Sequence, residues 1–142
     1  MDAREYLSQV KYMDQRIKNK LEEIEYWKDQ AENPALAPFE AEKVQSTRNI
    51  SKTADLICKY VDLQQELQQD IEELAAMRKQ TIATLEQLPL NEYDVLYKLY
   101  IQYERYYNMQ AVADALEKSY SWVTMMHGRA LKSLQKLIDE RR

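Results

Sequence analysis

The sequence has few of the residues that interrupt helices, glycine and proline, and few of the reactive residues cysteine and histidine. It contains one glycine and three prolines in 142 residues, which favours an all-helical fold. Cys58 is its single cysteine, so an intrachain disulfide and a thiolate zinc cluster are both excluded. No apolar run approaches the roughly 20 residues of a membrane span, and the N-terminus is not a signal peptide. We therefore expect a soluble cytoplasmic protein with no membrane partner.

Charge is distributed unevenly along the chain. The formal net charge is −4, which argues against nonspecific wrapping of nucleic acid by the whole molecule. Residues 1–87 hold 12 Lys/Arg and 17 Asp/Glu, whereas residues 88–142 hold 8 and 7. From Ser119 onward the balance is 5 basic to 2 acidic residues, a local charge of +3. Any surface that binds a polyanion is therefore expected near the C-terminus.

Two long amphipathic helices are predicted in residues 1–87. Asp2 and Glu5 form a capping-box pattern at the start of the first, which should end before Asn33-Pro34. Its apolar positions recur every three or four residues: Tyr6, Val10, Met13, Ile17, Leu21, Ile24, Trp27 and Ala31. After a polar connection, residues 33–51, the second helix repeats the pattern: Leu56, Tyr60, Leu63, Leu67, Ile71, Leu74, Met77 and Leu85. Because each helix is apolar on one face, we expect a coiled-coil-like antiparallel hairpin that buries this face against itself or against a second subunit.

A separate unit of three helices is predicted after Leu88-Pro89, in residues 88–142. Asn91, Asn108 and Ser119 are the expected cap residues of these helices. The last helix places its apolar residues on one side: Val123, Met126, Ala130, Leu134 and Ile138. A tight turn between the last two helices completes a helix-turn-helix pattern. The usual turn glycine is missing, so Glu117 or Lys118 must form the turn without it.

The C-terminal unit carries an extended motif. It begins with Leu88-Pro89, Glu92, Val95-Leu96 and Tyr100, continues with Asn108-Met109-x-x-Val112-Ala113-x-x-Leu116, and ends with Ser119, Val123, Met126 and Arg129-Ala130-Leu131-x-x-Leu134. This motif resembles region 4 of bacterial sigma factors. The resemblance implies that the helix after Ser119 enters the major groove of double-stranded DNA.

A second likeness covers nearly the whole chain. The segments that carry it are AREYLSQVKYMDQRIKNKLEEI, KVQSTRN, YVDLQQEL and SWVTMMHGRAL. They resemble a family of small phage and prophage proteins of Gram-positive bacteria, in which a helical hairpin precedes a sigma-region-4-like end. Members related in layout, the ArpU-like late-gene regulators, imply control of phage transcription in the bacterial host cell. In that role the hairpin would supply a homodimer contact or a contact with host RNA polymerase.

The helix after Ser119 has an outward stripe that is poor in basic residues. Its groove-facing positions are Tyr120, Ser121, Thr124, Met125 and Gly128. Hydroxyls can bond base edges and Met can touch thymine methyls, but none of these residues offers the bidentate guanine contact of arginine. Basic residues follow, and Arg129, Lys132 and Lys136 are the expected phosphate contacts. The sequence leaves open whether the stripe contacts DNA or whether Tyr120, Trp122 and Met125 contact a protein instead.

Several other residues have two interpretations each. Gly128, the only glycine, lies in mid-helix, where it allows either close approach of a phosphate or partner or tight packing on the preceding helix. Six tyrosines between Tyr93 and Tyr107 either stack on bases or pack the hairpin onto the C-terminal unit. His127 is expected to form a phosphate or core-edge hydrogen bond, and Cys58 to be a buried apolar group.

No combination of side chains suggests an enzyme. The sequence has no nucleophile–base pair, phosphate-binding loop or carboxylate dyad, and its single histidine lacks a second metal ligand. We therefore expect no catalytic residue, metal, cofactor or small-molecule substrate. Two hypotheses remain: a DNA-binding transcription regulator, and a sigma-like decoy or adaptor that binds host RNA polymerase or another host machine without reading DNA.

Overall fold

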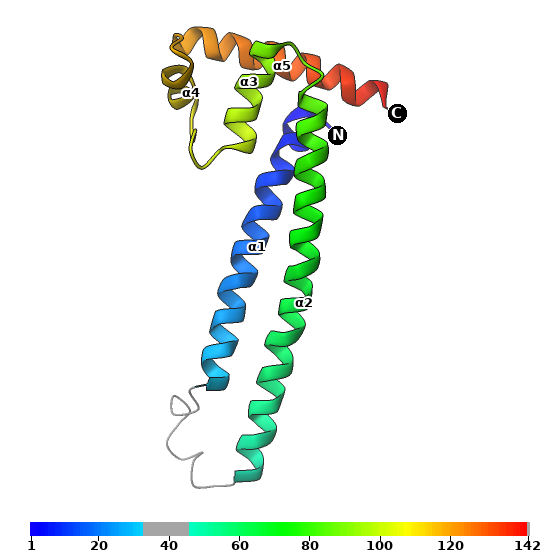
Figure 1. Cartoon of the computed structure of the whole chain (residues 1–142), viewed down its shortest axis with the longest axis vertical. Helices are drawn as coiled ribbons and strands as arrows, with labels where there is room; N and C mark the ends of the chain where they lie inside the picture. Colours follow the sequence, from blue (N-terminus) through cyan, green and yellow to red (C-terminus); the bar gives the residue numbers. More distant parts are fainter. Residues whose placement is uncertain (33–45, 142) are drawn as a thin grey trace. The chain divides into compact units, whose positions relative to one another are not determined.

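The computed structural model describes residues 1–32 and 46–141, in which the regular secondary structure is helical and no strand occurs (Figure 1). The helices are α1 (Ala3–Glu32), α2 (Ser46–Leu85), α3 (Leu90–Leu96), the π-helical turn η3 (Tyr97–Ile101), α4 (Met109–Leu116) and α5 (Tyr120–Glu140). The predicted all-α fold, with two long helices before a smaller helical unit, is confirmed. Within the described part of the chain, no helix has both the length and the apolar content that crossing a membrane requires.

Side-chain caps explain where three of the helices begin. Asp2, Asn108 and Ser119 each accept a hydrogen bond from the backbone N–H three residues later, at 2.8, 2.8 and 3.0 Å. These three predicted caps are confirmed. The fourth is wrong, because α3 already begins at Leu90 and no side chain caps it, so Asn91 lies inside the helix.

The connection between the long helices is shorter than the predicted 33–51. α2 begins at Ser46, so residues 46–51 belong to a helix. The prediction rested on polarity, and polar residues are equally compatible with the solvated face of a helix. Residues 33–45, which include both prolines of this region, lie outside the described residues.

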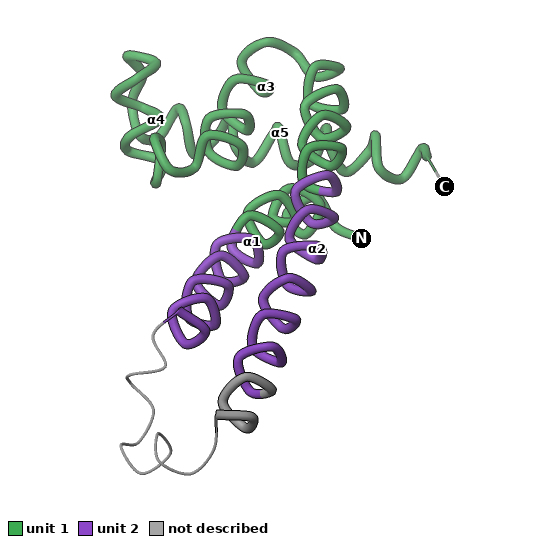
Figure 2. Tube along the Cα trace, turned by 60° about the horizontal axis from the view of Figure 1, so that its bottom comes forward, with its two compact units in different colours: residues 1–14, 74–142 green, residues 15–73 purple. Residues whose placement is uncertain are grey.

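The chain divides into two compact units (Figure 2). Unit 1 contains residues 1–14 and 74–142, and unit 2 contains residues 15–73. This division is not the predicted one at Leu88, because the first turns of α1 and the last turns of α2 pack in one core with the C-terminal helices. The structural unit that contains α4 and α5 therefore also includes the first turns of α1 and the last turns of α2.

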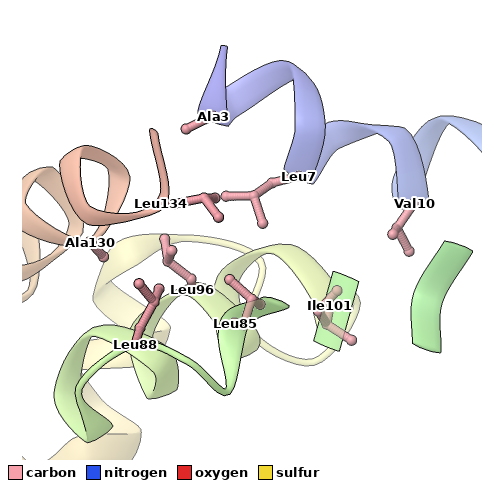
Figure 3. Close-up of a cluster of buried hydrophobic side chains, with 9 residues drawn as sticks. All are labelled: Ala3, Leu7, Val10, Leu85, Leu88, Leu96, Ile101, Ala130 and Leu134. Atoms are coloured by element: carbon pink, nitrogen blue, oxygen red, sulfur yellow. The ribbon is translucent and has the colours of Figure 1, made fainter. Parts of the chain in front are cut away.

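The core of unit 1 joins segments from the two ends of the chain. Figure 3 shows its buried side chains: Ala3, Leu7, Val10, Leu85, Leu88, Leu96, Ile101, Ala130 and Leu134. Leu7 is fully buried although the predicted stripe ran through its neighbour Tyr6, which is half-buried and bonded to the Thr84 hydroxyl at 3.0 Å. The start of α1 is thus covered on two sides. The predicted apolar stripe follows only one side of the helix, so it could not indicate that Leu7 is buried.

Unit 2 is an antiparallel pair of helix segments, in which residues 15–32 of α1 lie beside residues 52–73 of α2 (Figure 2). Its buried aliphatic side chains are Ile17, Ile24 and Leu67. Between them, the Lys20 ammonium lies 2.5 Å from the Asp70 carboxylate, which is itself buried. The predicted antiparallel contact between the two helices is present. It consists of a few buried aliphatic side chains together with the Lys20–Asp70 ion pair.

Three predicted burials in unit 2 are wrong. Leu21 and Ile71 are 46% and 42% exposed, because Lys20 and Asp70, one residue earlier in each helix, occupy the inward positions. Cys58 is exposed as well, since it lies beside the inward face of α2 and not on it. Apolar spacing alone could not indicate that an ion pair takes the place of two aliphatic side chains.

Candidate nucleic-acid interface

The turn between α4 and α5 forms without glycine. Glu117 follows α4 with φ 55° and ψ 43°, in the left-handed region. Its N–H bonds to the Asp114 carbonyl at 3.3 Å and that of Lys118 to the Ala113 carbonyl at 3.0 Å, the pattern of a Schellman motif. The prediction that one of these residues must form the turn is confirmed, and Glu117 adopts the conformation that costs a non-glycine residue about 1–2 kcal/mol.

A small apolar cluster holds α4 against α5. Its buried members are Val95, Val112, Ala113, Val123 and Met126. Ala113 and Val123 are completely buried, so a larger residue at position 113 would force the two helices apart. The direction of α5 relative to α4 is therefore fixed by close packing as well as by the turn.

The predicted groove-facing side of α5 is exposed along its whole length. Tyr120 and Met125 are 54% and 49% exposed, and Ser121, Thr124 and Gly128 are exposed too. The Thr124 hydroxyl donates to the Tyr120 carbonyl at 2.9 Å, so its proton is engaged within the helix. Its oxygen can still accept a hydrogen bond, whereas the hydroxyl groups of Tyr120 and Ser121 can both donate and accept.

Gly128 has no packing role within the described chain. A Cβ atom built at this position meets no atom within 4 Å. The interpretation that glycine allows tight packing on the preceding helix is therefore wrong. The interpretation that stays open is close approach of a partner to the exposed backbone.

Three exposed cations flank the groove-facing stripe. Arg129, Lys132 and Lys136 follow one another at spacings of three and four residues, which places them on one side of α5. Within the described residues, none of the three forms an ion pair. These side chains are therefore free to neutralise an external anion.

An aromatic surface lies at the start of α5. Trp122 is partly buried against the α4–α5 cluster, and the Lys118 ammonium lies 5.3 Å from the centre of its ring. The sequence analysis considered Lys118 only as a turn residue, although its place directly before the Ser119 cap also puts a positive charge beside this surface. Together with exposed Tyr120 and Met125, this surface has the composition of a protein contact.

His127 joins the middle of α5 to the π-helical turn. It is 5% exposed, its ring stacks on that of Tyr100, and its Nε2 lies 2.8 Å from the Tyr100 hydroxyl. The predicted core-edge hydrogen bond is confirmed, and burial rules out the phosphate alternative. Burial, and then the positive charge of Arg4, hold the pKa of His127 below its ordinary value, so this ring is neutral near pH 7.

The tyrosines pack within unit 1, and this packing interpretation is confirmed for most of them. Tyr93 and Tyr97 stack with ring centres 5.5 Å apart. The Tyr103 hydroxyl donates to the Asp14 carboxylate of α1, and burial followed by that bond raises the pKa of Tyr103. Tyr107 departs from the prediction, because it is 77% exposed.

Arg4 is a cation that sequence reasoning missed. The start of α1 contacts α5 where the Ala3 N–H donates to the Gln135 side-chain oxygen at 2.8 Å. Arg4 is exposed, and its charge acts on the pKa of both His127 and Tyr100. No sequence signal connects residues so far apart, because only the tertiary fold brings them together.

In the described ranges, no group of three or more His, Cys, Asp or Glu side chains is placed to hold a metal ion. Comparison of the chain with protein-family models, with curated proteins and with solved structures finds no match.

Proposed function

We propose that this protein is a phage-type transcription regulator that binds double-stranded DNA through α4 and α5. The observation that carries the proposal is the outer side of α5. It presents the exposed stripe of Tyr120, Ser121, Thr124, Met125 and Gly128 beside three cations without ion-pair partners in the described chain. The likeness to sigma region 4 and to ArpU-like late-gene regulators supports the assignment to transcription.

The two parts of this surface have different roles. Ser121, Thr124 and Met125 face the major groove, where hydroxyl oxygens accept from base donors and the Met side chain touches thymine methyls. Arg129 and Lys132 hold the phosphate backbone, which fixes orientation without reading sequence. Because the stripe has no arginine, the single unit binds duplex DNA with little preference for guanine.

A duplex titration at several salt concentrations tests the proposal. Each phosphate neutralised contributes about −0.9 to the slope of log K against log salt, so three cations predict a slope of roughly −3. Replacing two of them, Arg129→Glu with Lys132→Glu, should reduce the slope to about −1 and strongly weaken binding. Fluorescence anisotropy of a labelled duplex measures both quantities.

A charge-matched control separates local contact from net charge. Lys28→Glu with Lys79→Glu changes the net charge by the same amount at exposed positions on α1 and α2. This control should retain the slope and most of the affinity. A wild-type protein without salt-dependent duplex affinity, or equal losses in the two double variants, would contradict the proposal.

The hairpin supplies the second contact of such a regulator, through a homodimer or through host RNA polymerase. Joining two DNA-binding units raises the effective affinity by roughly 10²–10⁴ when both reach their half-sites. A module with few base contacts needs that gain to compete with nonspecific DNA.

The aromatic surface supports a second candidate, a sigma-like adaptor that binds host RNA polymerase without reading DNA. Tyr120 and Met125 are about half exposed beside Trp122, a combination enriched in protein interfaces. Met125→Glu should then abolish binding to purified bacterial RNA polymerase, while Arg129→Glu with Lys132→Glu leaves it intact. The opposite pattern excludes this candidate.

A further inference from the structure

Tyr107 stands apart from the other tyrosines between residues 93 and 107. The other five stack, pack or form hydrogen bonds within unit 1. Tyr107 is 77% exposed, and the described residues supply neither a ring contact nor a hydrogen bond to its side chain. Its hydroxyl is therefore available to an external partner, both as donor and as acceptor.

The backbone is held on both sides of Tyr107. Before it, Tyr106 packs against the α4–α5 cluster, and the cationic groups of Lys98 and Arg105 lie 5.6 and 5.3 Å from the centre of its ring. After it, the Asn108 side chain caps α4 by accepting from the backbone N–H three residues later at 2.8 Å. A partner that contacts the exposed ring therefore has little of the chain to order.

The start of α4 lies at one edge of the groove-facing stripe of α5. The Thr124 hydroxyl is 3.7 Å from the sulfur of Met109, the first residue of α4. Tyr107 precedes Met109 by two residues, a distance of at most about 7 Å along an extended backbone. The exposed tyrosine is therefore close to the same edge of the stripe as Thr124.

Two of the expected phosphate-binding cations lie at the other edge. Successive residues of an α-helix are turned by about 100°, so Arg129 and Lys136 lie about 120–140° around α5 from Thr124. A helix fills the major groove, which is about 12 Å wide and has a phosphate backbone on each side. With α5 in the groove, its two edges therefore meet two different backbones.

The charge near Tyr107 suits a neutral contact. Residues 102–108 contain one acidic and one basic residue, Glu104 and Arg105, so this segment has no net charge. A tyrosine hydroxyl is one of the uncharged donors that bind phosphate oxygens in protein–DNA complexes. Stacking of the ring on a base, by contrast, would require that base to leave the duplex. The hydroxyl is thus the group that an intact duplex can use.

We propose that the Tyr107 hydroxyl donates a hydrogen bond to a phosphate of double-stranded DNA, on the backbone across the major groove from the one that Arg129 and Lys136 contact. This contact rests on the proposed function, because it requires α5 to lie in the groove. It fixes the orientation of α5 by holding both strands, and it reads no base.

Tyr107→Phe tests the contact, because it removes the hydroxyl and keeps the ring. Loss of one hydrogen bond should weaken duplex binding by about 3- to 10-fold. Since tyrosine is neutral, the slope of log K against log salt should stay that of the wild type, and the loss should be equal on duplexes of different sequence. Fluorescence anisotropy measures both. Tyr26→Phe, which removes the hydroxyl of a 53% exposed tyrosine on α1, should bind as the wild type does.

Tyr107→Ala separates the hydroxyl from the ring. It should weaken binding by the same factor as Tyr107→Phe, and both variants should keep the wild-type circular dichroism and urea midpoint. An affinity that Phe preserves and Ala reduces would assign the contact to the ring and overturn the proposal. A lower midpoint of the Phe variant would assign the hydroxyl to the fold and overturn it as well.

The contact and the proposed function fail in different ways. A wild type without salt-dependent duplex affinity contradicts both. Duplex binding that is lost in the Arg129→Glu, Lys132→Glu variant but unchanged in Tyr107→Phe supports the proposed function and overturns the Tyr107 contact alone.

Discussion

Replacement of Gly128 by alanine separates the effect of this glycine on the stability of the fold from its effect on the binding of a partner. Gly128 lies inside α5 on its exposed side, and an added Cβ meets no atom within 4 Å. In an exposed helix interior alanine is more favourable than glycine by about 0.8–1.0 kcal/mol, because glycine loses more conformational freedom on folding. We expect Gly128→Ala to raise the free energy of unfolding by this amount.

Urea denaturation followed by circular dichroism measures the change. The midpoint should rise while the m-value stays constant, since the surface exposed on unfolding is the same. For a chain of this size the melting temperature should increase by about 2–4 °C. Lys136→Ala is the matched control on α5, with an expected change within about 0.5 kcal/mol. All proteins must be compared at one concentration, because a dimer's stability depends on it.

The same variant reports on the partner. If a phosphate or groove wall approaches the Gly128 backbone, the added methyl group weakens duplex binding although the folded protein is more stable. A stability that is unchanged or lower would refute the reasoning that this glycine is free of packing. An unchanged duplex affinity would show that no DNA atom comes close to Gly128.

Three further predictions concern the fold that supports α5. Glu117→Gly should stabilise the protein by about 0.5–1 kcal/mol in urea denaturation, because glycine adopts the left-handed conformation without strain; a loss of stability would contradict that strain. Because the pKa of folded His127 lies below 6.5, the unfolded chain binds this proton more readily, and stability should fall as the pH drops below about 6.5. His127→Gln should lack this part of the pH dependence, and an identical profile in both proteins would argue against the buried neutral ring. Leu7→Ala should lose about 2–5 kcal/mol and Leu21→Ala much less, since the first is fully buried and the second is 46% exposed; similar losses would contradict the core assignment.

Features set by neighbouring residues could be predicted from the sequence. The caps at Asp2, Asn108 and Ser119 need only a polar side chain and a backbone N–H three residues away. The turn at Glu117 follows from the short distance between two amphipathic helices. The exposed stripe of α5 follows from the helical period, because the inward residues fix the outward ones.

Features set by tertiary contacts could not be predicted. Leu7 is buried because α5 covers a second side of α1, and Lys20 takes an inward position because Asp70 is there to receive it. His127 is buried because the π-helical turn brings the Tyr100 hydroxyl to it. Each of these depends on a residue more than 25 positions away, beyond the reach of periodicity.

The weak chemistry of the α5 stripe explains why the proposed regulator needs the homodimer contact that the hairpin supplies. Phosphate contacts alone give nonspecific dissociation constants of about 10⁻⁴–10⁻⁶ M at physiological salt, and residues such as Ser121 and Met125 add little discrimination. A homodimer raises affinity for two correctly spaced half-sites by roughly 10²–10⁴ without a new base contact. Spacing between half-sites then carries the specificity that the side chains of α5 lack. In anisotropy titrations the protein should accordingly bind a duplex with two correctly spaced half-sites about 10²–10⁴-fold more tightly than a duplex with a single half-site. Equal affinities for the two duplexes would separate the homodimer from DNA recognition.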